Sequence, residues 1–170
     1  MYEDEIDEIE VSTKYFGNII VNVDKCGNCD AYIDYNNQEI VIFFSDYNIY
    51  DDKGKMLLEI VDKYFEINEI AKKSIIEYFH KSKLLKYYFK WHFEMLRKST
   101  IMELFGVTSF KKMDIKNIVE KLKYPTLHCS MENGEKRISL AYMVSEFYTE
   151  EILSVKMNDR LKITGFLHES

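Results

Sequence analysis

Alternating apolar and polar positions mark the first part of the chain as a set of short strands. The extended runs cover residues 15–23, 31–35 and 39–45. Gly27-Asn28 and Asn36-Asn37 separate these runs, and such pairs are typical of hairpin turns. The pattern therefore predicts a three-stranded antiparallel meander near the N-terminus.

The third of these runs has an unusual composition. No polar residue interrupts it between Ile40 and Phe44. A continuous apolar run of this length is typical of a strand that is buried on both faces. We therefore expect this strand to lie in the centre of the sheet, with both of its faces covered.

The periodicity then changes from two residues to three or four, which indicates helices. Helical patterns cover residues 56–65, 70–98 and 114–121. The first helix is expected to end near Asn68. Residues 80–83 indicate a break in the long middle range, so two helices are expected there. Pro125 ends the helical region because proline disfavours helical geometry at the preceding residue.

Strand patterns return after Pro125. They cover residues 126–131, 137–147, 152–157 and 161–166, and Asn133-Gly134 favours a tight hairpin between the first two. Because strands and helices are segregated along the chain, the order predicts an α+β fold. We expect one antiparallel sheet built from an N-terminal three-stranded and a C-terminal four-stranded meander, with the central helices packed on one face.

Length and composition favour a single domain over residues 1–170. A chain of this length can bury one substantial core but not two. Its hydrophobic content of 46% and its single proline differ from the composition of a disordered chain. Residues 1–10 precede the predicted strands as an acidic N-terminal segment that could be flexible.

Several protein classes lack their characteristic sequence features here. No apolar run approaches the roughly 20 residues of a membrane helix. The acidic N-terminus also differs from the basic and then apolar start of a signal peptide. Three cysteines do not make a disulfide framework. We therefore expect a cytoplasmic protein without a membrane partner.

Motifs for catalysis or metal binding are weak. No Gly-x-Ser-x-Gly elbow and no glycine-rich loop after a strand is present. Cys26-Gly27-Asn28-Cys29 resembles half of a zinc site, and His128-Cys129 could supply the rest. A second Cys-x-x-Cys pair is missing, so coincidental cysteines in a hairpin turn are the favoured interpretation. We expect no enzymatic activity, no cofactor and no bound metal.

Charge is unevenly distributed along the chain, whose net charge is -6. The first ten residues hold six acids and no base, whereas residues 72–123 hold 13 bases and 5 acids. Within residues 81–98, basic side chains alternate with aromatic ones, a mixture that nucleic-acid grooves use for phosphate contacts and base stacking. The favoured alternative is an amphipathic helix whose aromatic side chains belong to the core.

Short motifs at both ends of the chain carry a family resemblance. They are Phe16-Gly17-Asn18-Ile19, Leu140-Ala141-Tyr142, residues 151–157, residues 163–166 and His168-Glu169-Ser170. With these motifs the chain resembles a family of small bacterial domains of unknown function, predicted to include immunity proteins of polymorphic toxin systems. Tyr32 stands where the family pattern has a tryptophan. The resemblance implies a non-enzymatic α+β domain that binds a cognate toxin.

An acidic immunity protein could mask the basic active site of a nuclease-type toxin, because complementary charge speeds association. We therefore expect the partner surface to combine N-terminal acids with tyrosines of the loop at residues 46–51. The candidate residues are Glu3, Asp4, Glu5, Asp7, Glu8, Tyr47 and Tyr50. The alternative function is a nucleic-acid-associated regulatory domain that uses residues 81–98. The sequence is compatible with a monomer or a homodimer.

Overall fold

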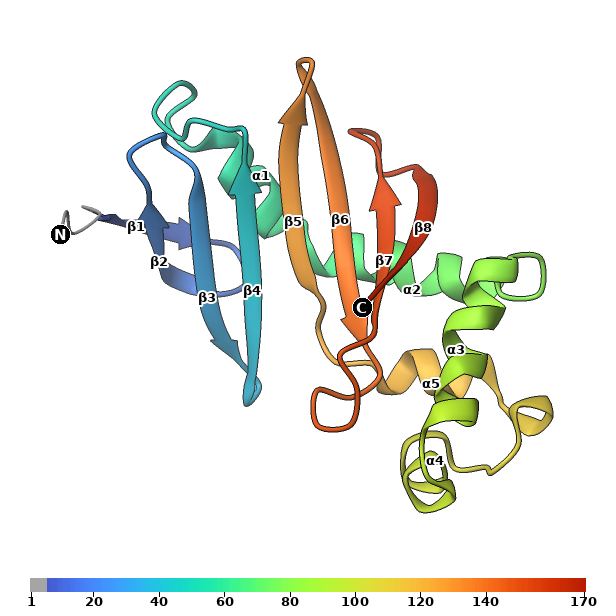
Figure 1. Ribbon diagram of the computed structural model, residues 1–170. Coiled ribbons are helices and arrows are strands. Elements are labelled where there is room, and N and C mark those ends of the chain that lie inside the picture. Colours follow the sequence, from blue (N-terminus) through green and yellow to red (C-terminus); the bar gives the residue numbers. More distant parts are fainter. Residues whose placement is uncertain (1–5) are drawn as a thin grey trace, which may run out of the picture.

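The structure, a computed structural model, describes residues 6–170 as an eight-stranded sheet with helices on one face (Figure 1). The strands follow one another across the sheet in sequence order. They are β1 (Asp7–Thr13), β2 (Gly17–Val23), β3 (Cys29–Tyr35), β4 (Gln38–Ser45), β5 (Thr126–Glu132), β6 (Glu135–Met143), β7 (Ile152–Met157) and β8 (Ile163–Glu169). The predicted α+β class and the antiparallel character of most of the sheet are confirmed.

One parallel pairing joins the two halves of the sheet, and the other pairings between described strands are antiparallel. β4 and β5 run in the same direction, with Phe43 beside His128 and Phe44 beside Cys129. A parallel pair cannot be closed by a hairpin and needs a long crossover. Residues 46–125 form that crossover and contain the helices. We call this β4–β5 pairing the seam.

The N-terminal meander has four strands rather than the predicted three. β1 pairs with β2 from Asp7 opposite Val23 to Thr13 opposite Gly17. The expectation that residues 7–10 lie outside the strands is therefore wrong. Ile9 packs against the core between acidic neighbours, and the high density of acids hides this alternation in the sequence. Residues 1–5 of the acidic segment lie outside the described residues.

The crossover contains five helices within the described residues. They are α1 (Lys55–Asp62), α2 (Tyr64–Tyr78), α3 (Lys83–Met95), α4 (Lys98–Phe105) and α5 (Ile115–Lys121), with a short 3-10 helix at Phe110–Lys112. The break predicted near residues 80–83 is confirmed, and Ser82 caps α3 by accepting a hydrogen bond from the Leu85 backbone N–H at 3.2 Å. The helix end predicted near Asn68 is wrong, because α1 ends at Asp62 and α2 runs through Asn68. The sequence pattern does not predict α4.

Buried tyrosines tie the helices to the second half of the sheet. Tyr64 on α2 donates to the Pro125 carbonyl at 2.7 Å, just before β5. Tyr142 on β6 donates to the Asn68 side-chain oxygen on α2 at 2.6 Å. A buried hydroxyl is costly unless it is hydrogen-bonded. These bonds therefore fix the position of α2 over the sheet.

The second face of the sheet is open to solvent, as Figure 1 shows with α1 and α2 behind the strands. In β4, Ile40, Ile42 and Phe44 are buried against the helices. Phe43 lies on the opposite face and is 36% exposed. The expectation that β4 is buried on both faces is wrong, because the helices cover only one face. The apolar run arises because the open face itself carries apolar side chains.

The Tyr142–Asn68 bond gives a test of the packing between α2 and the sheet. Asn68→Ala removes the side-chain acceptor of a buried phenol, so we expect the free energy of unfolding to fall by about 1–3 kcal/mol. Urea unfolding followed by circular dichroism measures this change. The control is Asn18→Ala, which removes an exposed bond to Glu10 and should change stability by less than about 0.5 kcal/mol. Equal losses in the two variants would contradict the packing role of Asn68.

Candidate functional site

Exposed apolar side chains gather on the open face of the first four strands. Ile20 is 50% exposed, Tyr32 is 52% exposed, and Phe43 lies near them on β4. The rings of Tyr32 and Phe43 meet edge to face with their centroids 6.3 Å apart. Single exposed apolar residues are ordinary, but a group of them on one rigid surface is typical of a binding site.

Carboxylates surround this apolar group. Strand alternation places them on the same face as Phe43, and no lysine or arginine occupies an open-face position of β1 to β4. Together we call these residues the acidic aromatic face: Glu8, Glu10, Ile20, Asp30, Tyr32, Asp34, Glu39 and Phe43. The face is therefore apolar in its centre and negatively charged around it.

A hollow of about 420 Å³ opens on this face beside Phe43, next to the seam. Its wall includes Asn22, Asp24, Asp30, Ser45 and His128. The Ser45 hydroxyl and the His128 Nε2 atom are 2.7 Å apart and hydrogen-bonded across the seam. The hollow thus combines an aromatic ring, two carboxylates and several neutral polar groups.

The carboxylate of Asp24 is a fixed negative charge in the wall of the hollow. It accepts hydrogen bonds from the Asn28 side chain and from the backbone N–H groups of Cys26 and Asn28, at 2.8 to 3.0 Å. These bonds, led by the Asn28 side chain, lower the pKa of Asp24. The group therefore stays ionised well below neutral pH.

The structure brings together only some of the predicted partner residues. Tyr50 is 55% exposed, and its hydroxyl donates to Asp7 at 3.2 Å. Glu8, the next residue of β1, lies on the open face. Tyr47 is only 8% exposed and donates to Asp52 at 2.6 Å, so the expectation that it is a surface anchor is corrected. Glu3, Asp4 and Glu5 lie outside the described residues.

Sequence reasoning missed the acidic aromatic face. The sequence pattern predicts that Phe43 lies in a strand covered on both faces, and it does not indicate that Tyr32 is exposed. The apolar run at residues 40–44 could have indicated an exposed apolar face, because alternate residues of any strand point to opposite faces. A sheet covered by helices on one face only must therefore expose either the odd-numbered or the even-numbered members of such a run.

The three cysteines do not assemble a metal site. Cys26 is exposed, whereas Cys29 and Cys129 are buried on either side of Phe44 on the covered face. Within residues 6–170, no three His, Cys, Asp or Glu side chains are grouped to hold a metal ion. Burial raises the pKa of Cys29 to about 12 and that of Cys129 to about 11. Both side chains are therefore protonated thiols, which are poor ligands and nucleophiles.

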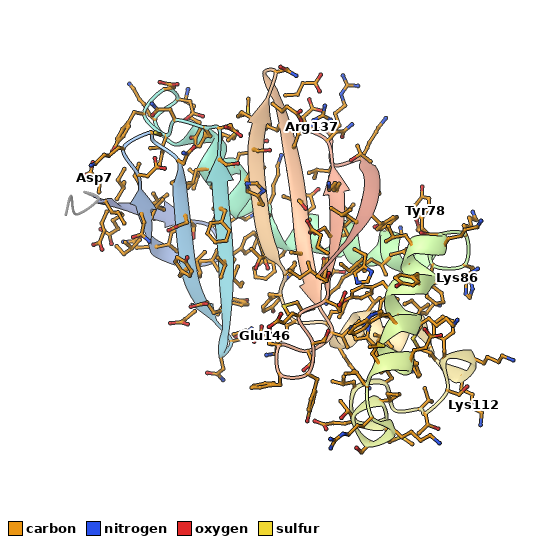
Figure 2. All side chains as sticks on the ribbon, viewed as in Figure 1. Asp7, Tyr78, Lys86, Lys112, Arg137 and Glu146 are labelled. Carbon is orange, nitrogen blue, oxygen red and sulfur yellow. The ribbon has the colours of Figure 1, made fainter. Side chains whose placement is uncertain are left out.

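The basic aromatic segment at residues 81–98 belongs largely to the core. Tyr88 and Phe89 are buried, and only Tyr87 among its five aromatic side chains is strongly exposed, at 57%. Figure 2 places Lys86 and Lys112 at the helical end of the molecule, far from Asp7 at the β1 end. The core interpretation holds for Tyr88, Phe89 and Phe93 but not for Tyr87, and nucleic-acid binding by this segment stays a prediction.

A second group of titratable side chains is shielded between α3 and the last two strands. His168 pairs with the carboxylate of Glu151, and its ring meets the Tyr88 ring edge on at 5.2 Å. His92 hydrogen-bonds the Tyr88 carbonyl through Nδ1 at 2.8 Å, and desolvation lowers the pKa of His92. On the open face of the same strands, the exposed Glu169 accepts a hydrogen bond from Ser154 at 2.6 Å. These contacts agree with a packing role for the C-terminal residues.

The state of the cysteines can be measured directly. In the folded protein at about pH 8, iodoacetamide should alkylate Cys26 alone, because Cys29 and Cys129 are buried thiols with raised pKa values. Mass spectrometry counts the adducts. Folded Cys26→Ser should take up none, and urea-unfolded wild type should take up one on each cysteine. Rapid labelling of Cys29 or Cys129 in the folded protein would show that their burial is misassigned.

Comparisons with known proteins identify no relative. No protein-family model matches the chain, and no curated protein or solved structure matches it significantly. Among residues 6–170, no helix has the length and apolar character that crossing a bilayer requires. The resemblance to immunity proteins therefore stays a prediction.

Proposed function

We propose that the chain is a non-enzymatic protein whose acidic aromatic face binds a basic protein partner. The observation that supports this most strongly is the exposure of Ile20, Tyr32 and Phe43 within a ring of carboxylates on one face of the sheet. An apolar centre with a polar rim is the usual anatomy of a protein interface, and aromatic side chains often supply most of its binding energy.

The rigidity of the surface supports a binding role. Tyr32 and Phe43 stand on β3 and β4, which lie inside the sheet and pair with a neighbour on each side. Side chains on such strands lose little conformational freedom when a partner docks. For the same contact area, the acidic aromatic face therefore binds a partner with a smaller loss of conformational entropy than a flexible loop of the same composition does.

The charge of the first half of the chain indicates the chemistry of the partner. Residues 6–71 contain 14 acidic and 5 basic side chains. Such an excess attracts positively charged proteins and raises their association rate, and salt weakens the attraction. A basic protein is therefore the best-matched partner for this end of the molecule.

The most specific form of the proposal is an immunity protein that acts in the cytoplasm against a nuclease-type toxin. Nucleases bind polyanions and carry basic active sites, which the acidic aromatic face would cover. Asp7 and Tyr50 would extend the interface around the edge of β1. Glu3, Asp4 and Glu5 precede β1 in sequence, and they remain candidate partner residues on the basis of the sequence alone.

The arrangement of polar groups favours binding over catalysis. Ser45 and His128 form a hydroxyl–imidazole pair, the start of a nucleophilic site. Within the described residues, no carboxylate hydrogen-bonds to the other ring nitrogen of His128, so the group that orients the base in a catalytic triad is missing. We therefore propose that Ser45 and His128 shape the surface and do not perform a reaction.

The proposal is tested with the protein encoded by the gene directly upstream of this one. We expect its C-terminal domain to be toxic when expressed alone, and co-expression of the chain should restore growth and give a stable complex. The double variant Tyr32→Ala/Phe43→Ala should weaken that complex by about 100-fold or more, because it removes two aromatic anchors. Biolayer interferometry measures the affinity.

The matched control is Tyr78→Ala/Tyr87→Ala, which removes two exposed tyrosines from the helical end of the molecule. This pair should leave the affinity within about threefold of wild type. The immunity proposal is wrong if the upstream domain neither inhibits growth nor binds the chain. The assignment of the surface is wrong if the control pair weakens the complex and the Tyr32/Phe43 pair does not.

A further inference from the structure

The hollow beside Phe43 is the most specific feature of the acidic aromatic face. In the strand register, Asp30 lies opposite Phe43 on one side and His128 lies beside Phe43 on the other. The three side chains therefore form one row across β3, β4 and β5, with neighbours about 5 Å apart. The aromatic ring occupies the middle of this row, between a carboxylate and an imidazole.

Asp30 is positioned to receive a hydrogen-bond donor from outside the chain. The Asn22 side-chain amide donates to Asp30 Oδ1 at 2.8 Å, which fixes the orientation of the carboxylate. The second oxygen of Asp30 accepts no hydrogen bond from residues 6–170. Asp30 and Asp24 also form no ion pair within those residues, although both line the hollow. No lysine or arginine among residues 6–170 lines the hollow, whose lining carries the two carboxylates.

We infer that this hollow receives an arginine side chain of the basic partner, an inference that rests on the proposed function of the acidic aromatic face. A guanidinium group is planar and always charged, and it can donate two parallel hydrogen bonds to one carboxylate. It can also stack on an aromatic ring, which a phenylalanine between two polar walls offers. Asp30 supplies the carboxylate and Phe43 the ring.

The neighbouring surface sets the direction in which the partner lies. A second hollow on the other side of His128 is lined by hydroxyl groups and by charged side chains of both signs, namely Glu132, Arg137, Lys156 and Glu169. His128 lies beside Ser139, and Ser139 lies beside Lys156, so the row that begins at Asp30 continues to a cation. Beyond the seam the open face thus carries charges of both signs, whereas the open-face positions of β1 to β4 carry carboxylates and no lysine or arginine. A partner arginine is therefore attracted more strongly to the Asp30 side than to the Lys156 side.

A metal ion is a poorer occupant of the same hollow. Within residues 6–170, no group of three His, Cys, Asp or Glu side chains is placed to coordinate one. Both oxygens of Asp24 already accept hydrogen bonds from its own turn. A guanidinium needs only the free oxygen edge of Asp30 and the face of Phe43, and the hollow provides both.

The inference is tested on the free protein by nuclear magnetic resonance titration. The probe is N-acetyl-arginine amide, and its neutral isostere N-acetyl-citrulline amide is the control ligand. The arginine probe should shift the amide signals of Asp30, Phe43 and Ser45 in a saturable manner, and the citrulline probe should not. Asp30→Asn should weaken arginine binding by about tenfold, because it removes the charge and keeps the acceptor for Asn22.

Asp34→Asn is the matched control variant, since it removes a carboxylate from the same strand and face outside the hollow. It should leave arginine binding within about twofold of wild type. Equal shifts with the two probes, no saturable shift near Phe43, or equal effects of the two variants would each overturn the inference.

Measurements on the partner complex separate this inference from the proposed function. If the complex depends on Tyr32 and Phe43 but its affinity is unchanged by Asp30→Asn, the arginine site is wrong and the surface is right. If the arginine probe occupies the hollow but no basic protein binds the face, the proposed function fails while the cation site stands. A loss of affinity that is clearly larger with Asp30→Asn than with Asp34→Asn supports both.

Discussion

The parallel pairing of β4 with β5 is the constraint on which the rest of the structure depends. A hairpin can close each antiparallel pair, but the parallel pair requires the chain to leave the sheet and return to its starting end. Residues 46–125 form this crossover connection, and their helices lie on one face of the sheet. The opposite side stays uncovered, and the seam places Phe43 beside His128 in the middle of it. The exposed surface is therefore a consequence of the topology.

Packing on the covered face of the sheet holds the open face in a fixed shape. Tyr64 and Tyr142 are fully buried, and their hydroxyls bind groups on the facing layer, so α2 holds the sheet in one position. With the backbone fixed in this way, the side chains of β3 and β4 can face solvent without loss of order. Exposing apolar side chains to water is energetically unfavourable, and folding does not require it here. A binding function explains why this face keeps them. The ring of carboxylates keeps such a surface soluble.

The sequence predicts the parts of the fold that depend on local pattern, and it fails where distant segments decide the outcome. Segregated periodicities predict the α+β class, and residues 80–83 indicate the break before α3. The direction of β5 relative to β4 is a long-range property, so neither strand pattern contains it. The sequence pattern does not predict β1, because acids outnumber its two apolar residues, Ile9 and Val11. Tyr47 looked like a surface residue, and only its contact with Asp52 shows otherwise.

The central claim is that the acidic aromatic face is the surface covered by a basic partner. Hydroxyl-radical footprinting of the free chain and of its complex, read by mass spectrometry, reports the solvent exposure of each aromatic side chain. Tyr32 and Phe43 are exposed in the free chain and should lose reactivity in the complex, while Tyr87 on α3 should keep it. Protection of Tyr87 with unchanged reactivity of Tyr32 and Phe43 would place the partner on the helical end and contradict the account.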